Sequence, residues 1–288
     1  MPATAFYRIA VTMFLRLIAV ALALSWLAGC ASVNDDPTKD WGPDKLYTEA
    51  RTRLSDSEWE EAIKLYEKLE ARFPYGRYAE QAQLEIAFAY YKYDEPAQAL
   101  AAIERFIRQH PTHPNVDYAY YLKGVVNFSG ERSFINWLFG SKDDPMERDP
   151  RAMRDAHEAF RELVTRFPKS RYAHDGAQRA AYLFDAMARY EVHVAEFYYN
   201  RGAYIATLNR CKYTLENFPR TPATEDALGI QAMAYKKLRL TKLQDDTLRV
   251  LRLNFPNSRY FAKVEAVKPP PPKKPAALSA SPDARSQT

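Results

Sequence analysis

Between residues 44 and 262, apolar side chains recur at the three- and four-residue spacing of amphipathic helices. Such runs cover 78–93, 116–128, 172–200 and 223–238, and a second helical run follows each of them. Together with the helical pattern of 44–74, this makes five pairs, and the second helix of each pair ends in a proline step: Phe73-Pro74, His110-Pro111, Phe167-Pro168, Phe218-Pro219 and Phe255-Pro256. Because proline cannot continue a helix, these steps divide the chain into paired helices. The pattern predicts an all-α, superhelical array of about five helical hairpins.

The hairpins resemble tetratricopeptide repeats, whose unit is a pair of closely packed helices. The predicted repeats span 44–74, 78–111, 115–168, 172–219 and 222–256, and an insertion at 129–149 interrupts the third. Close packing needs a small residue twelve positions before the closing proline. Ala62, Ala99 and Ala156 fit this rule, whereas Thr207 and Gln244 fit it less well. An apolar residue follows four positions later in every repeat: Tyr66, Ile103, Phe160, Cys211 and Leu248.

The amino terminus has the pattern of an export signal. Arg8 and Arg16 accompany an apolar stretch, 17–27, that is too short to span a membrane comfortably. The stretch ends in Leu27-Ala28-Gly29-Cys30, which resembles the lipobox of bacterial lipoproteins. The resemblance implies cleavage before Cys30, acylation of that residue and, with Ala31 rather than aspartate after it, an outer-membrane destination. The alternatives are an ordinary secretory signal with a chance cysteine and a short membrane anchor.

These patterns divide the chain into a signal peptide (1–29), a lipidated flexible tether (30–43), the repeat domain (44–262) and a disordered Pro/Lys/Ala/Ser tail (263–288). The formal charge is 41 − 36 = +5, but the basic excess lies largely in the signal and the tail. The repeat domain is close to neutral, which argues against a nucleic-acid partner.

With Cys30 acylated, Cys211 has no disulfide partner, and its helical spacing predicts a buried side chain.

No pattern in the sequence indicates catalysis or a cofactor. His110 and His113 share a repeat-boundary turn, but only Asp117 lies near them as a further metal ligand. Glycine-rich phosphate loops, nucleophile elbows and the zinc-peptidase motif do not occur. We therefore expect a protein that is not an enzyme and that holds no metal and no cofactor.

The concave face of such an array is its candidate binding surface, because the first helices of the repeats line it. Repeat offsets place a largely aromatic set there: Tyr47, Leu84, Phe88, Tyr91, Lys92, Tyr118, Tyr121, Val125 and Phe128. This surface suits an extended peptide with aromatic or aliphatic side chains, whose terminal carboxylate Arg51 or Lys92 could bind. The alternative is that several of these rings belong to the core.

The insertion carries a second candidate surface. Phe134, Trp137 and Phe139 lie close together between polar ends, a composition typical of protein interfaces. The patch either contacts a partner or folds back on the groove as a plug.

Taken together, the lipobox, the hairpins and the insertion resemble one family, the BamD (ComL) lipoproteins of the outer-membrane β-barrel assembly machinery. The residues that carry the resemblance are Arg72-Phe-Pro-Tyr-Gly-Arg-Tyr78, Ala89-Tyr-Tyr-Lys92, Arg105-Phe-Ile-Arg108, His110-Pro-Thr-His-Pro-Asn115, Arg148-Asp-Pro150 and Val194-Ala-Glu-Phe-Tyr-Tyr-Asn-Arg-Gly-Ala-Tyr204. They cover nearly the whole mature chain, and the proline-lysine tail departs from the family's pattern.

The resemblance implies a scaffold held on the outer membrane by the lipid on Cys30 and facing the periplasm. Its carboxy-terminal repeats would contact the barrel-forming subunit, a contact to which we carry over Arg201 and Arg210, and accessory lipoproteins would be further partners. Its amino-terminal repeats would receive unfolded outer-membrane proteins, whose carboxy-terminal signal typically ends in an aromatic residue. The alternative is another periplasmic repeat lipoprotein, one that coordinates cell-envelope division or wall enzymes.

Overall fold

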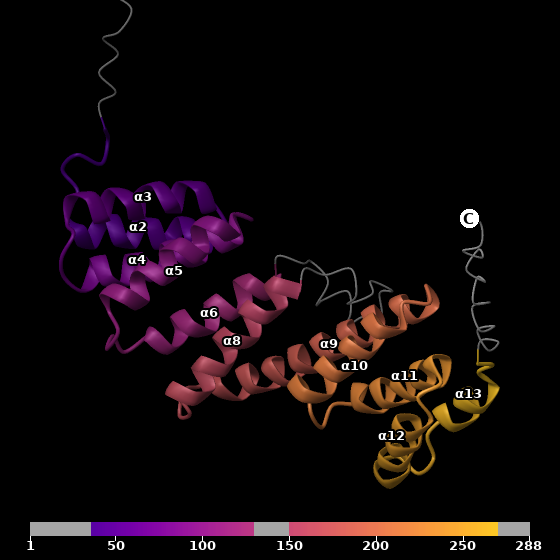
Figure 1. The fold of residues 1–288 in the computed structure, drawn as a ribbon. Helices are drawn as coiled ribbons and strands as arrows, with labels where there is room; N and C mark the ends of the chain where they lie inside the picture. Colours follow the sequence, from indigo (N-terminus) through magenta and orange to yellow (C-terminus); the bar gives the residue numbers. More distant parts are fainter. Residues whose placement is uncertain (1–35, 130–149, 270–288) are drawn as a thin grey trace, which may run out of the picture.

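The computed structural model describes residues 36–129 and 150–269. Within these ranges every regular element is a helix, and successive helices pair along a curved array (Figure 1). The predicted all-α array of about five tetratricopeptide-like hairpins is confirmed. No helix in the described ranges is long and apolar enough to cross a membrane.

The described residues form five hairpins and a closing helix. The bounds are α2 (Pro43–Ser55) and α3 (Trp59–Arg72); α4 (Arg77–Lys92) and α5 (Pro96–Gln109); α6 (Val116–Ser129) and α8 (Pro150–Arg166); α9 (Ala173–Asn200) and α10 (Tyr204–Asn217); α11 (Ala223–Leu238) and α12 (Thr241–Asn254); and α13 (Tyr260–Ala266).

Proline marks both the starts and the ends of helices in the array. Pro43 and Pro96 stand at the starts of α2 and α5, where a backbone N–H would have no partner within the helix. At the end of α3, the N–H of Phe73 still bonds to the Leu69 carbonyl at 2.8 Å, but Phe73 has left the helical conformation. The residue before a proline is disfavoured in the α region, so the helix stops there. The same arrangement ends α5, α10 and α12.

The small residues predicted at the helix crossings are buried. Ala62, Ala99 and Ala156 have no exposed surface. Thr207, the poorer match, is fully buried as well, because its hydroxyl donates a hydrogen bond to the Ala203 carbonyl at 3.2 Å. Cys211 is buried as predicted, and burial raises the pKa of its thiol to about 12.

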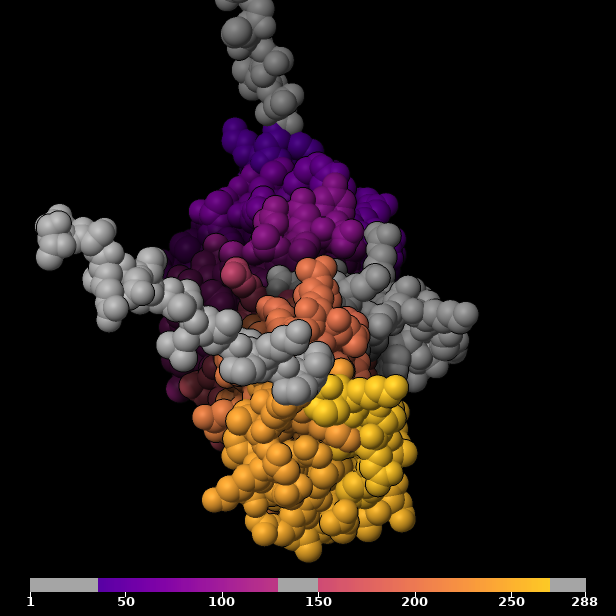
Figure 2. All heavy atoms as spheres, turned by 45° about the vertical axis from the view of Figure 1, so that its right-hand side comes forward, coloured from indigo at the N-terminus to yellow at the C-terminus, as the bar shows by residue number. Residues whose placement is uncertain are grey.

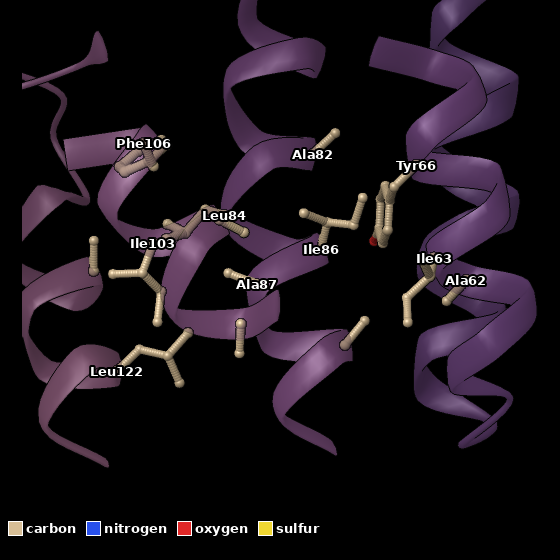
Figure 3. Close-up of a cluster of buried hydrophobic side chains, with 14 of the residues drawn as sticks. Ala62, Ile63, Tyr66, Ala82, Leu84, Ile86, Ala87, Ile103, Phe106 and Leu122 are labelled. Carbon is tan, nitrogen blue, oxygen red and sulfur yellow. The ribbon is translucent and has the colours of Figure 1, made fainter. Parts of the chain in front are cut away.

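Two clusters of buried side chains form the core, one built on α2 to α6 and the other on α6 to α13. Figure 3 shows part of the first cluster. Ile86 of α4 points towards Tyr66 of α3, whereas Leu84 lies on the side of Ile103 in α5. Because α4 is packed on both sides, side chains only two positions apart are both almost fully buried.

The folded part differs from the predicted domain at both ends. Residues 36–42, predicted as part of the flexible tether, pack on α3: Thr38 is buried, and Asp36 pairs with Lys68 at 2.9 Å. At the other end, the predicted disordered tail began at 263, whereas α13 continues to Ala266. It does so because Val264 is buried and its carbonyl accepts a hydrogen bond from Lys236. Residues 1–35, which include Cys30, and 130–149 and 270–288 lie outside the described residues.

The closing helix α13 covers the last hairpin. Tyr260 is fully buried against α11, where a Cβ on Gly229 would lie 2.0 Å from the Tyr260 ring. Only glycine allows this close approach. In Figure 2, the yellow carboxy-terminal residues lie against the orange surface of the preceding helices. The closing helix therefore covers part of α11.

Candidate functional site

A pocket of about 340 Å³ lies between the first helices of the first three hairpins. We call it the amino-terminal pocket; its lining residues are Arg51, Leu54, Ser55, Gln81, Leu84, Glu85, Phe88 and Tyr118. Helical spacing brings them together, because residues three and four apart share one face of α2 or α4. Leu84, Phe88 and Tyr118 belong to the groove predicted from the sequence.

Glu85 is the hydrogen-bond acceptor of this pocket. The hydroxyl of Tyr47 donates to Oε1 at 2.9 Å, and the hydroxyl of Tyr66 donates to Oε2 at 2.8 Å. The side-chain amide of Gln81 donates to Oε1 at 3.2 Å. Burial, reinforced by the charge of Glu85, raises the pKa values of both tyrosines above the ordinary range. Both hydroxyls therefore stay protonated, and they hold the carboxylate in a fixed position.

Arg51 provides a positive charge at the same pocket. Its side chain is exposed, and it forms no ion pair with any described residue. Arg53, two positions later, is in contrast paired with Glu49 at 2.9 Å and with Glu58 at 2.6 Å. The guanidinium of Arg51 is thus available for a carboxylate of a ligand.

An aromatic rim continues from the pocket towards the end of α4. The rings of Phe88 and Tyr91 lie 6.3 Å apart, and the ammonium of Lys92 is 5.8 Å from the centroid of Phe88. The same ammonium lies 5.8 Å from the ring of Trp59. Lys92 therefore sits over aromatic rings, as a cation–π partner. Tyr47 packs on Tyr78 with ring centroids 5.4 Å apart.

Tyr118 and Tyr121 extend the aromatic surface to the fourth hairpin. Tyr121 stacks on Tyr172 at 4.8 Å with an angle of 19° between the ring planes, and Tyr118 lies 5.4 Å from the same ring. The hydroxyl of Tyr121 donates to Asp175 at 2.8 Å, and Arg179 donates to the same oxygen. Burial acts to raise the pKa of Asp175, but these hydrogen bonds outweigh it and lower that pKa. The carboxylate thus fixes the tyrosine ring in place.

Two predicted groove residues are core residues, and the other hydrophobic ones are half-buried against the core. Leu84 is 2% exposed: it forms the floor of the pocket with its side chain directed towards α5. Phe128 is 5% exposed and belongs to the second core cluster, where it meets Tyr182 edge to face. Val125 is half-buried against the same cluster. The reason is that α6 packs between α5 and α8, so its last turn is enclosed.

The sequence prediction missed some residues of the amino-terminal pocket and one residue of the aromatic surface beside it. Leu54, Ser55, Gln81 and Glu85 line the pocket, although three of them are polar. Their signal was their helical spacing from Tyr47 and Phe88, which a search for apolar residues does not detect. Tyr172 was missed because it belongs to the fourth hairpin, whereas the predicted groove ended with the third. The candidate patch of Phe134, Trp137 and Phe139 lies outside the described residues.

The residues predicted for the subunit contact lie at the corner between α9 and α10. Arg201 caps the end of α9, three positions before α10 begins. Gly202, at φ +77°, makes the turn. The guanidinium of Arg201 lies 4.4 Å from the centroid of the Phe197 ring, and Phe197 is 46% exposed. An arginine and an aromatic ring are thus presented together to solvent.

Arg210 lines a separate pocket of about 360 Å³ on the same two helices. The other lining residues are Tyr198, Ala206, Asn209 and Tyr213. One guanidinium nitrogen lies 3.0 Å from a carboxylate oxygen of Glu191, which is almost fully buried in α9. The pair joins α9 to α10 and orients Arg210, whose side chain stays 44% exposed. Arg201 does not line this pocket.

In the described part of the chain, no group of three or more histidine, cysteine, aspartate or glutamate side chains could hold a metal ion. His110 and His113 instead pack on Phe106, with ring centroids 5.3 and 5.2 Å away. They serve the packing of a repeat boundary.

Comparisons with known proteins point to one family. Residues 39–251 match the model of the YfiO family, described as an outer membrane lipoprotein. The chain is 49% identical over 246 residues to the outer membrane protein assembly factor BamD of Neisseria gonorrhoeae, covering 85% of this chain and 91% of that protein. It is 40% identical over 233 residues to the protein of the same name from Vibrio cholerae, covering 81% and 95%.

The chain is also similar to a more distant sequence relative and to a solved structure of a repeat protein. The BamD of Haemophilus influenzae is 36% identical over 262 residues, covering 91% of this chain and 97% of that protein. A structure of tetratricopeptide-like repeats from a putative kinesin light chain of Podosopora anserina covers 76% of this chain and 94% of its own. Its identity of 14% and TM-score of 0.33 carry no argument. On the family model and these sequence relatives, the chain belongs to the BamD family of outer membrane lipoproteins.

Proposed function

We propose that this protein is a non-enzymatic scaffold for outer membrane protein assembly, anchored by lipid on Cys30 and facing the periplasm. Relatives named as outer membrane protein assembly factors support the assembly role. The lipobox before Cys30 supports the anchor. The amino-terminal pocket is the observation that carries the proposal, because it combines apolar walls with a fixed acceptor and an exposed arginine that forms no ion pair with the described residues. Such a pocket binds a peptide end without altering it.

The amino-terminal pocket receives the carboxy-terminal segment of an unfolded outer-membrane protein. An aromatic side chain of the client packs on Leu54 and Phe88 over the floor formed by Leu84. The client's terminal carboxylate pairs with Arg51, and its backbone N–H groups donate to Glu85. A hydrogen bond to a charged group contributes about 1.5–3 kcal/mol, so Arg51 provides a measurable part of the affinity.

Peptide binding tests this assignment. A fluorescent peptide that ends in phenylalanine is titrated with the protein, once with a free carboxylate and once with a carboxy-terminal amide. We expect Arg51→Ala to weaken binding of the free acid about tenfold or more and to leave the amide nearly unchanged. The matched control is Arg53→Ala, on the same helix outside the pocket. Equal losses for both peptides, or for both variants, would exclude the role of Arg51.

The corner between α9 and α10 docks onto the barrel-forming subunit. Phe197, Ile205 and Tyr213 are 46, 61 and 39% exposed there, beside Arg201 and Arg210. Exposed aromatic rings next to arginine are the composition of interface hot spots. The buried Glu191 orients Arg210, so less side-chain freedom is lost when a partner binds.

A pull-down from membranes in mild detergent, followed by mass spectrometry, tests the docking. We expect the barrel-forming subunit and accessory lipoproteins to be recovered, and to be lost with Arg201→Glu combined with Arg210→Glu. The control is Arg249→Glu on α12, whose exposed side chain pairs only with Asp246 in the described chain. Recovery of division or wall-remodelling proteins instead would contradict the proposal.

A further inference from the structure

Tyr75, in the turn between α3 and α4, is 91% exposed, more than any other large hydrophobic side chain in the described residues. It forms no hydrogen bond and no ring contact within the described chain. We propose that this turn contacts the headgroup region of the membrane that carries the lipid anchor, and so orients the first repeat on the bilayer. The inference rests on the proposed lipidation of Cys30 and goes beyond the proposed function.

The position equivalent to Tyr75 carries no aromatic residue in the later repeats. The position after the closing proline is Tyr75 in the first repeat, whereas the later repeats have polar residues there: Thr112, Lys169, Arg220 and Asn257. Packing does not explain the difference, because the ring of Tyr75 is almost completely exposed. The first turn therefore differs from its equivalents in a feature that only an external partner can use.

Residues 36–42, which we call the strap, hold the start of the described chain against α3 next to this turn. The carboxylate of Asp36 pairs with Lys68 at 2.9 Å and with Arg72, the last residue of α3. Arg72 also donates to the carbonyl of Thr38, which is buried. A hydrogen bond from Lys68, followed by those from Thr38, holds the pKa of Asp36 well below its ordinary value. The strap is thus charged and closed at neutral pH.

The lipid cannot lie far from the strap. Five residues, 31–35, separate Asp36 from Cys30. An extended chain advances at most about 3.5 Å per residue, so the two Cα atoms lie within roughly 20 Å of each other. In Figure 1, the chain enters the array at the end formed by α2 and α3, opposite the end formed by α12 and α13. Because Arg72 precedes the turn directly, a lipid on Cys30 keeps Tyr75 near the bilayer surface.

The chemistry of the turn suits a phospholipid surface. Tyrosine prefers the interface between membrane and water, where its ring is in an apolar layer and its hydroxyl remains hydrated. Arg77 follows two positions later; it is exposed, and its guanidinium can bind a headgroup phosphate. Gly76 adopts φ +98°, a conformation that lets the turn hold Tyr75 away from the helices. A second contact beside the anchor fixes an orientation that acyl chains alone leave free.

Fluorescence quenching in vesicles tests the proposal. The full-length lipoprotein, with acyl chains on Cys30 verified by mass spectrometry, is reconstituted into phosphatidylethanolamine and phosphatidylglycerol vesicles that contain a spin-labelled lipid quencher. Tyr75→Cys and, as the matched control, Asn257→Cys each carry a small fluorophore; Cys211 is buried and serves as the unlabelled background. We expect strong quenching at position 75 and little at position 257. Equal quenching at the two positions in acylated protein would overturn the inference alone.

Two further outcomes complete the test. Absence of acyl chains on Cys30 would overturn the inference together with the proposed anchor. Asp36→Asn should release the strap and reduce quenching at position 75, while Asp40→Asn, an exposed neighbour, should leave it unchanged. Undiminished quenching in the Asp36→Asn protein would contradict the role of the strap.

Discussion

The two halves of the array keep their apolar side chains in different places. In the amino-terminal half, α2 to α6, only Tyr75 and Tyr93 are large hydrophobic side chains exposed among the described residues. The carboxy-terminal half, α8 to α13, exposes a larger set: Phe197, Ile205, Tyr213, Leu240, Leu243, Val250 and Leu253. The first half instead holds its rings half-buried around a pocket.

The two halves are therefore suited to two different kinds of binding partner. In the proposed function, a pocket of about 340 Å³ with a fixed carboxylate and an exposed arginine selects one chemical group at a time. An exposed set of leucine, isoleucine and aromatic side chains suits a broad protein contact that removes them from water. In the proposed function, one repeat architecture thus provides a ligand site at one end and a docking surface at the other.

The largest effect is expected at the helix that closes the carboxy-terminal half. Tyr260→Ala should lower the free energy of unfolding by about 3–5 kcal/mol, because it leaves a cavity between α11 and α13. Tyr260→Phe should change it by less than about 0.5 kcal/mol, since the buried hydroxyl has no hydrogen-bond partner in the described chain. Urea unfolding followed by circular dichroism measures both values. Similar losses for the two variants would show that the hydroxyl is bound.

The next prediction compares one aromatic substitution in each half. Phe88→Ala should weaken binding of an aromatic-ending peptide about tenfold and leave recovery of the barrel-forming subunit unchanged. Phe197→Ala should do the opposite, because its ring lies under Arg201 at the α9–α10 corner. Peptide titration and quantitative pull-down are run on both variants. If either variant impaired both activities in a folded protein, the division between the halves would fail.

A smaller effect is expected at the buried tyrosine of the amino-terminal half. Tyr66→Phe should lower the free energy of unfolding by about 0.5–1.5 kcal/mol, because Glu85 loses a donor at 2.8 Å. The comparison with Tyr260→Phe is a matched one, since both rings are fully buried and only one hydroxyl is paired. Urea unfolding of the two variants side by side provides the measurement. Equal changes in the free energy of unfolding for the two variants would show that the hydrogen bond to Glu85 does not stabilise the first half.

The smallest effect is expected at the strap. The folded-state pKa of Asp36 lies below its ordinary value, so its contribution is present above about pH 4 and is lost as the pH falls through the folded-state pKa. Asp36→Asn should therefore speed hydrogen exchange at the Trp41 N–H, which bonds to the Thr38 carbonyl, at neutral pH. Exchange in α11 should stay the same. Protection at Trp41 equal to that of the parent would show that backbone turns alone hold the strap.

The hairpins were predictable because helical spacing and closing prolines are local features of the sequence. The strap was not, since it depends on pairing between Asp36 and Lys68, 32 positions apart. Phe128 was wrongly predicted to line the groove. Its burial depends on packing against α8, which lies beyond an insertion in the sequence, so local spacing does not reveal it. Arg51 was predicted as a partner for a terminal carboxylate, whereas Glu85 was not predicted at the groove, because a search for apolar faces passes over the polar groups that give a pocket its selectivity.

Site-specific photo-crosslinking tests the division of labour most directly. A photoreactive amino acid replaces Ser55, which lines the amino-terminal pocket, or Asn209, which lines the Arg210 pocket; both side chains are exposed. In cells that synthesise outer-membrane proteins, we expect crosslinks from position 55 to unfolded clients and from position 209 to the barrel-forming subunit. Crosslinks from position 55 to the subunit and from position 209 to clients would contradict this division.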